Sequence, residues 1–179
     1  PLGVIVATPP ETHHQIGLRL LDARVPVLME KPLVSATAEA GCFAEQFRQA
    51  GVPLVVGYQF RHTKALRALK DQVDAGEFGM LHAAHAALAT RWWCSGTYPA
   101  DLLLECSHEL DLLCWFLGLP LSVETLNWSA PGDAAPGAWA GTIMFLRSVA
   151  ATFVLNGVAD GYHRRFTLYG TRGVGVWEF

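Results

Sequence analysis

Short apolar runs alternate with amphipathic stretches along the first 76 residues of the chain. The unbroken apolar runs predict strands buried on both faces, as in a parallel sheet. The stretches that follow them place apolar residues on one helical face and stop at residues such as Gly51 and Gly76. The predicted strands cover residues 3–7, 25–29 and 52–57, and the predicted helices 11–23, 35–50 and 63–75. This repeated order predicts parallel strands joined by right-handed crossovers.

The pattern changes after Gly76. A long strand of small residues is predicted at 80–91, an irregular segment at 92–100, and a short apolar helix at 108–117 with Ser107 as its N-cap. Further strands, separated by turn residues, are predicted at 121–129, 139–147, 149–157 and 164–170. The fold class is therefore α/β: a partial parallel sheet, then an α+β domain with a mainly antiparallel sheet. We place the boundary between 1–76 and 77–179.

Composition excludes several classes of protein. Among 179 residues, 51% are hydrophobic and 16% charged, which excludes a mainly disordered chain. The net charge of −3 and the lack of any Lys/Arg run argue against nucleic-acid binding. The longest apolar stretch is far shorter than the roughly 20 residues of a membrane span. Four cysteines without a Cys-x-x-Cys pair indicate reduced thiols in a reducing compartment, for which we expect the cytoplasm.

Lys31 is the first candidate for chemistry. The tripeptide Glu30-Lys31-Pro32 follows a predicted parallel strand, at the edge where ligands bind in open α/β sheets. Pro32 holds this strand end stiffly. Lys31 is either a surface lysine or a group that exchanges a proton with an alcohol, because burial and a nearby cation both lower a lysine pKa.

A polar cluster at the start of the apolar helix is the second candidate. Glu105 and Asp111 each lie three residues from His108, so both can approach its face. A histidine with a carboxylate partner exchanges protons near neutral pH. The alternative is a surface histidine at a helix start. A metal site is disfavoured because the Cys and His spacings fit no closed zinc pattern. A Ser107–His108 nucleophile pair is weaker still, since adjacent residues do not face one another.

Two further segments carry binding candidates. The turn Thr8-Pro9-Pro10 with His13 opens a helix, whose N-terminus presents N–H groups to an anion or polar ligand; the alternative is a proline-rich turn with a capping threonine. Arg61, just after the third strand, either holds a phosphate or carboxylate or pairs with an acidic residue at the domain boundary.

Taken together and in order, six segments resemble the Gfo/Idh/MocA oxidoreductase family. They are Val4–Pro10 with His13, Val27–Leu33, Val56–Arg61, Gly76–Gly79, Leu104–Asp111 before Trp115–Gly118, and Gly170–Gly173.

The resemblance implies an NAD- or NADP-dependent dehydrogenase of sugars, cyclitols or related alcohols. It implies an N-terminal Rossmann domain, of which 1–76 is the C-terminal part, and a second domain at 77–179 for substrate binding and oligomer contacts. Lys31 is then the catalytic lysine and His108 the acid/base on the substrate side. The cofactor-contacting positions implied are Thr8, Pro9, His13, Glu30, Lys31 and Pro32, with Arg61 as a further candidate.

This sequence departs from the family pattern in two ways. The usual acid lies four residues before the histidine, where this chain has Leu104, so Glu105 is a variant candidate for the catalytic set. The chain also contains no Gly-x-Gly-x-x-Gly loop, and we expect that loop and the ribose-binding acid to precede a truncated N-terminus.

Two other functions remain open from the sequence. A non-catalytic ligand-binding or regulatory protein on the same fold is the main alternative, although the presence of both Lys31 and His108 favours the enzyme. A metal-dependent hydrolase or lyase is disfavoured by the absence of ligand spacing. The resemblance implies a sugar-like small-molecule partner and a homo-oligomer formed through the second sheet, with neither nucleic acid nor membrane as partner.

Overall fold

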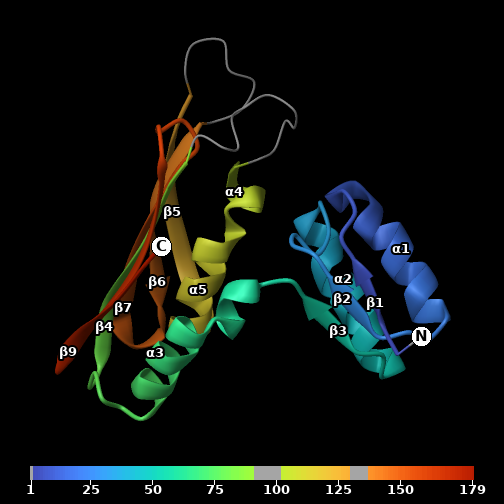
Figure 1. The fold of residues 1–179 in the computed structure, drawn as a ribbon, viewed down its shortest axis with the longest axis horizontal. Coiled ribbons are helices and arrows are strands. Elements are labelled where there is room, and N and C mark those ends of the chain that lie inside the picture. The colour runs from blue at the N-terminus through green and yellow to red at the C-terminus, as the bar shows by residue number, and fades with distance from the viewer. Residues whose placement is uncertain (1, 91–101, 130–136) are drawn as a thin grey trace. The chain divides into compact units, whose positions relative to one another are not determined.

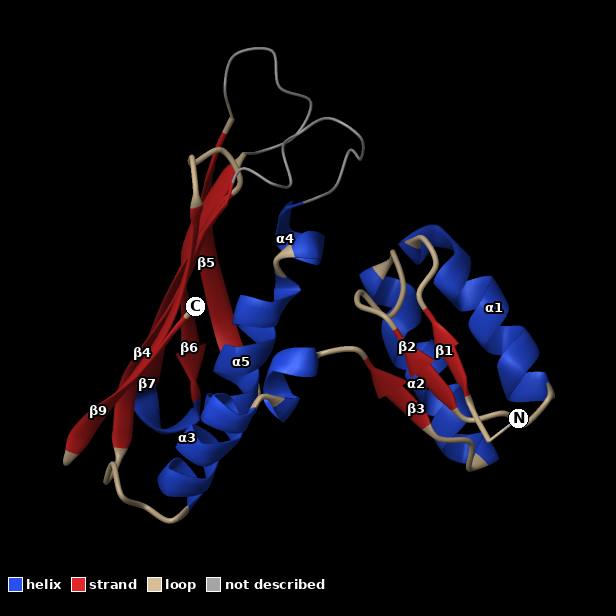
Figure 2. Cartoon of the chain, viewed as in Figure 1, coloured by secondary structure: helices blue, strands red, loops and turns tan. Residues whose placement is uncertain are grey.

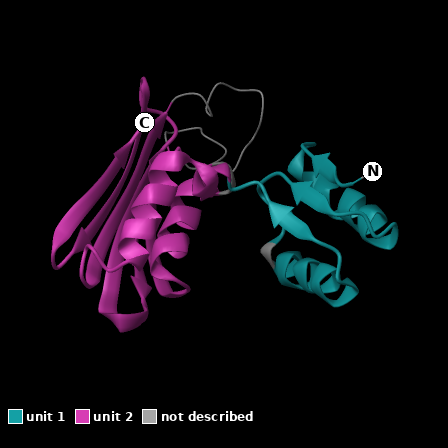
Figure 3. Cartoon of the chain, turned by 60° about the horizontal axis from the view of Figure 1, so that its bottom comes forward, with its two compact units in different colours: residues 1–58 teal, residues 59–179 magenta. Residues whose placement is uncertain are grey.

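The computed structural model describes residues 2–90, 102–129 and 137–179. It forms two compact units, residues 1–58 and 59–179, coloured separately in Figure 3. The predicted irregular segment 92–100, Cys94 and the turn at 131–133 lie outside the described residues.

Unit 1 is a three-stranded parallel sheet with two helices (Figures 1 and 2). Its elements are β1 (Val4–Val6), α1 (Pro10–Asp22), β2 (Val27–Met29), α2 (Thr37–Ala50) and β3 (Leu54–Val56), with strand order β1-β2-β3. The predicted strand–helix alternation and parallel pairing are confirmed. Helix α2 ends at Gly51, whose φ of 66° is the left-handed conformation that favours glycine.

The core of unit 1 lies between the sheet and its helices. Met29 of β2 and both Phe43 and Phe47 of α2 are almost fully buried there. Gly17 of α1 belongs to the same layer, because a Cβ at this position would overlap the ring of Phe43 and lie 3.1 Å from Cε of Met29. The missing side chain is what lets α1 approach β2 and α2 closely.

We expect Gly17→Ala to destabilise unit 1 by about 1–3 kcal/mol, the usual cost of overpacking a core. The gain of about 1 kcal/mol that alanine brings to a helix interior is smaller than this cost. Gly41→Ala is the matched control, since Gly41 of α2 has no atom within 4 Å of its would-be Cβ and gains helix propensity alone. Urea unfolding of the two variants should show opposite signs, and equal stabilisation would refute the close approach.

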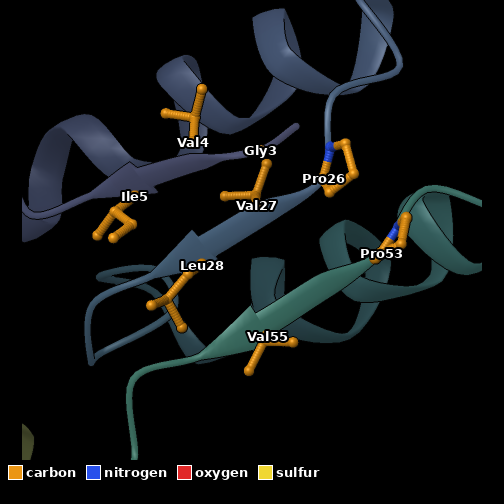
Figure 4. A pocket seen from close by; sticks show the side chains of 8 residues that line it. All are labelled: Gly3, Val4, Ile5, Pro26, Val27, Leu28, Pro53 and Val55. Carbon is orange, nitrogen blue, oxygen red and sulfur yellow. The ribbon is translucent and has the colours of Figure 1, made fainter. Parts of the chain in front are cut away.

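The opposite face of this sheet is open in the described residues. Ile5, Leu28 and Val55 are paired across the three strands and are 72%, 39% and 51% exposed. With Pro26 and Pro53 they line an apolar hollow of about 320 Å³ (Figure 4). The sequence predicted burial on both faces, but α1 and α2 cover one face only, as right-handed crossovers in sequential strand order require.

Unit 2 packs helices on one face of a six-stranded mixed sheet of order β5-β6-β7-β4-β8-β9 (Figure 2). Its strands are β4 (Leu81–Thr90), β5 (Pro120–Trp128), β6 (Ala138–Phe145), β7 (Val149–Asn156), β8 (Tyr162–Gly170) and β9 (Gly173–Glu178). The helices are η1 (Gln59–His62), α3 (Lys64–Asp74), α4 (Leu102–Glu105), α5 (Ser107–Leu117) and η3 (Leu146–Ser148). The mainly antiparallel sheet is confirmed, with β4 and β7 as its one parallel pair among the described strands.

Three details of unit 2 differ from the sequence prediction. The four-residue helix α4 and the edge strand β9 were not predicted, since one is a single turn and the other is rich in glycine. The predicted N-cap was wrong by one residue: Cys106 is the N-cap, and Ser107 is the first helical residue. The Ser107 hydroxyl is buried without a hydrogen-bond partner among the described residues, so it does not cap α5.

The units divide after residue 58, whereas the sequence pattern placed the domain boundary at 76. Leu66 and Leu69, on the inward face of α3, belong to the core of unit 2. Helix α3 therefore packs against β9 and η1 rather than completing a third strand–helix repeat of the parallel sheet.

The open face of the second sheet carries His85 in its central strand. Its Nδ1 lies 2.8 Å from Oγ1 of Thr152 on β7. Burial, and then the positive charge of Arg165, lower the pKa of His85 below its ordinary value. A base with a lowered folded-state pKa binds its proton more readily when unfolded.

The contribution of His85 to the free energy of unfolding is therefore greatest above the ordinary histidine pKa of about 6.5. It is lost as the pH falls through the lowered folded-state pKa. We expect His85→Asn to reduce the fall in melting temperature between neutral and mildly acidic pH. His82→Asn, at an exposed position of the same strand, is the control. An unchanged pH dependence in His85→Asn would contradict the assignment.

Among the described residues, no helix is long and apolar enough to cross a membrane. The three cysteines that the structure describes are free thiols: Cys106 is buried, Cys114 half-buried and Cys42 exposed.

Candidate functional site

The carboxyl ends of β1, β2 and β3 lie at one edge of the parallel sheet. The chain leaves this edge as Thr8, Glu30 and Tyr58, one or two residues beyond each strand end. The strands stay paired up to the edge, since the Glu30 N–H donates to the Val6 carbonyl at 2.8 Å and the Gly57 N–H to that of Met29 at 2.7 Å. Ligands of open α/β sheets bind at such an edge.

Glu30, Lys31 and Pro32 form the segment that leaves β2. The Lys31 N–H donates to Oε2 of Glu30 at 3.1 Å, and the Lys31–Pro32 peptide is cis. A Cβ on Gly57 would lie 3.1 Å from Oε1 of Glu30, so the glycine leaves room for this carboxylate beside β3. Lys31 is half-buried and Pro32 buried. The structure thus places the predicted lysine on a tightly held strand end.

His13 lies beneath this edge and is fully buried. Its Nδ1 is 2.8 Å from the Pro32 carbonyl oxygen, and its Nε2 is 2.9 Å from the Thr8 carbonyl oxygen. The ring therefore bridges the turn after β1 and the segment after β2, two of the segments singled out in the sequence.

The N-terminus of α1 opens onto the same edge. Thr12 donates its hydroxyl to the Pro9 carbonyl at 2.7 Å and lies 2.6 Å from the Thr8 hydroxyl. No described side chain caps the helix, and both Thr8 and Pro9 are exposed. An uncapped helix N-terminus offers backbone N–H groups to an anion or a polar ligand.

In unit 2, His108 occupies the first turn of α5 and is 6% exposed. The ring of Phe60, from η1, meets it edge-on at a centroid distance of 4.8 Å. Glu105 ends α4 three residues earlier, but its side chain lies outside the described part of the structure. The predicted partnership of Glu105 with His108 therefore stays a prediction.

Asp111, the other predicted neighbour of His108, pairs with Arg61. The Arg61 Nε donates to Oδ2 at 2.9 Å and a terminal nitrogen donates to Oδ1 at 2.5 Å, with the carboxylate almost buried. This two-point contact joins η1 to α5. It corresponds to the second alternative that the sequence left open for Arg61, pairing with an acid, and a role of Arg61 in cofactor binding stays a prediction.

A buried ion pair that the sequence patterns did not predict lies beside His108. Nε of Arg164, on β8, lies 2.6 Å from Oε1 of Glu109, and both side chains are less than one-tenth exposed. The Arg164 guanidinium also stacks over the ring of Phe60, 4.4 Å from its centroid.

The hydrophobic patterns of α5 and β8 place one charged residue of each element at an inward position, which could have predicted this pair. Glu109 shares the inward stripe of Leu112 and Phe116, and Arg164 shares the inward face of Phe166 and Leu168. Two opposite charges at inward positions of two core elements predict a buried pair.

The structure thus gathers Thr8, Pro9, His13, Glu30, Lys31 and Pro32 at one edge of unit 1. It places His108 and Arg61 in unit 2. Within the described residues, no three His, Cys, Asp or Glu side chains are grouped as metal ligands.

A family model and curated relatives both relate this chain to NAD-binding oxidoreductases. Residues 1–58 match the family described as "Oxidoreductase family, NAD-binding Rossmann fold". The chain is 30% identical to inositol 2-dehydrogenase of Mycolicibacterium gilvum, over 97% of this chain and 52% of that protein. It is 38% identical to inositol 2-dehydrogenase 1 of Mycolicibacterium vanbaalenii, over 96% of this chain and 52% of that protein. The chain spans about half the length of these curated relatives.

Solved structures agree with this fold. GenD2 from gentamicin A biosynthesis, crystallised with NAD, is 26% identical with a TM-score of 0.84, over 99% of this chain and 54% of that one. A levoglucosan dehydrogenase is 18% identical with a TM-score of 0.90, over 98% of this chain and 54% of that one. The second likeness concerns the fold alone. The predicted family resemblance is confirmed.

Proposed function

The chain belongs to the Gfo/Idh/MocA family of oxidoreductases, and we propose on that basis that the protein is an NAD-dependent dehydrogenase of a sugar, cyclitol or related alcohol. The observation that carries the proposal is Lys31, held between a carboxylate and a buried proline at the ligand edge of a parallel sheet. The names of the curated relatives make an inositol the first substrate to test.

NAD fits the edge described in unit 1. Exposed Thr8 and Pro9 precede an uncapped helix, whose first N–H groups suit a polar or anionic ligand. Thr8, Pro9, Glu30 and Pro32 are the positions that we propose to lie along the cofactor, and Arg61 is a weaker candidate because Asp111 engages it. When bound, NAD⁺ supplies the acceptor for a hydride from an alcohol carbon.

Lys31 and His108 handle the hydroxyl proton in this proposal. Oxidation of an alcohol to a ketone releases that proton, so a neutral amine or imidazole is needed to accept it. Lys31 acts from the strand end of unit 1. His108 is the imidazole of unit 2 whose ring is held by Phe60, and Glu105 is its proposed carboxylate partner.

The test is an assay of the complete purified protein with NAD⁺ or NADP⁺ against myo-inositol, scyllo-inositol and D-glucose. We expect formation of reduced cofactor with an inositol and NAD⁺. Calorimetric binding of an inositol without any turnover would favour the alternative, a non-catalytic ligand-binding protein. Neither binding nor turnover with any cyclitol or sugar would overturn the proposal.

We further infer that the second sheet pairs with a second copy of the protein through its open face. Leu126 of β5, Val154 of β7 and Val176 of β9 are 80%, 41% and 48% exposed on this face. Large exposed apolar patches mark interaction surfaces. Analytical ultracentrifugation should show an oligomer, and the double variant Leu126→Lys with Val154→Lys should dissociate it. A monomeric wild-type protein would refute this pairing.

We also propose a cytoplasmic location.

A further inference from the structure

His13 connects two segments that no strand pairing holds together. The pairing of β1 with β2 ends at Val6 and Met29, and Thr8 and Pro32 lie beyond those ends. Both ring nitrogens of His13 reach across, one to each carbonyl oxygen, at 2.9 and 2.8 Å. Because the ring is fully buried, solvent does not compete for these contacts.

The chemistry of the ring suits this bridge. Imidazole carries its two nitrogens on separate edges of one rigid plane, so it spans two acceptors with little conformational freedom. A ring with both protons donates to both carbonyls, and a ring with one proton donates to one of them. The buried Pro32 carbonyl carries a desolvation cost when it loses its donor, so we expect its segment to move when the ring is replaced.

The segment that the ring holds is the one that presents Lys31. On one side of Lys31, the carboxylate of Glu30 accepts its backbone N–H. On the other side, Pro32 is tied through its carbonyl to His13. The backbone of Lys31 is thus held from both neighbours.

We propose that His13 is a positioning residue that fixes the backbone of Lys31 for proton transfer. This inference rests on the proposed function for the role of Lys31. A misplacement of about 1 Å at a reacting group costs on the order of 10²-fold in rate. His13 therefore acts through Pro32 and Thr8 rather than by touching substrate or cofactor.

The decisive variants are His13→Phe, which keeps a buried ring without N–H groups, and His13→Gln, whose single amide nitrogen can donate to one of the two carbonyls. His14→Phe is the matched control, because His14 is the next residue of α1 and its side chain is 41% exposed. Gly17→Ala is the stability control, since it strains the core of the same unit without touching either segment.

We expect the Lys31 amide to exchange with solvent faster in His13→Phe, and its NMR signals to shift, while far-UV circular dichroism stays native. In the complete protein, kcat should fall on the order of 10²-fold with little change in KM, and His13→Gln should recover part of it. His14→Phe and Gly17→Ala should leave the Lys31 amide unchanged.

Unchanged Lys31 exchange and kcat in His13→Phe would overturn the proposal. So would an equal change in Gly17→Ala, because that result would mean a general loss of stability. The exchange measurement needs no substrate, so it decides the role of His13 in holding Lys31 even if the wild-type protein shows no dehydrogenase activity.

Discussion

Replacement of Lys31 by alanine should lower kcat by about 10²–10⁴-fold, the usual contribution of general acid–base catalysis. The variant removes the amine that we propose to exchange a proton with the substrate hydroxyl, and it leaves the exposed Thr8 turn and the α1 N-terminus in place. The affinity for NAD⁺ should therefore change much less than kcat. Steady-state kinetics across pH, together with calorimetric titration of the cofactor, measure the two effects separately.

Lys64→Ala is the control, because Lys64 is an exposed residue of α3 and lies in the other unit. His108→Ala should also lower kcat and should change the pH profile, since imidazole titrates near neutrality. If both side chains act on one proton, the double variant loses less than the product of the two single losses. A near-normal kcat in Lys31→Ala would favour the non-catalytic alternative.

Breaking the buried ion pair of unit 2 should have the largest effect on stability. Arg164→Met leaves the Glu109 carboxylate uncompensated in a site where it is 2% exposed, and Glu109→Gln removes the charge that balances Arg164. Removal of one partner of a buried pair costs about 3–5 kcal/mol. Urea unfolding followed by tryptophan fluorescence measures the loss.

The neighbouring pair Arg165–Glu178 is the matched control. Its nitrogen–oxygen distance is 3.0 Å, but both side chains are about half exposed, so Arg165→Met should cost less than about 1 kcal/mol. Glu109→Leu with Arg164→Met should cost less than either single change, because no charge is left alone in the core. Equal losses for Arg164→Met and Arg165→Met would refute a special role for the buried pair.

Local patterns along the chain were sufficient to predict most helices and strands and to name the candidate residues for proton transfer and cofactor binding. The apolar runs predicted β1, β2 and β3, because strands with little polar surface need a buried position, and Gly51 and Gly76 marked two helix ends. Six ordered segments were enough to predict the family, and that resemblance is confirmed. Edge strand β9 was not predicted, because glycines alternate with its first apolar residues and weaken the apolar pattern.

The partners of the candidate residues follow from tertiary packing, because the contacts that define them join segments distant in the sequence. Helical spacing allowed Asp111 to approach His108, yet its carboxylate binds Arg61, fifty residues earlier in the chain. The family resemblance implied a cofactor-contacting position for His13, and the structure adds that its two buried ring nitrogens lie against the carbonyl oxygens of Pro32 and Thr8. Sequence spacing encodes neighbours within one element, but contacts between elements depend on how the core packs α5 against the sheet and α1 beneath its edge.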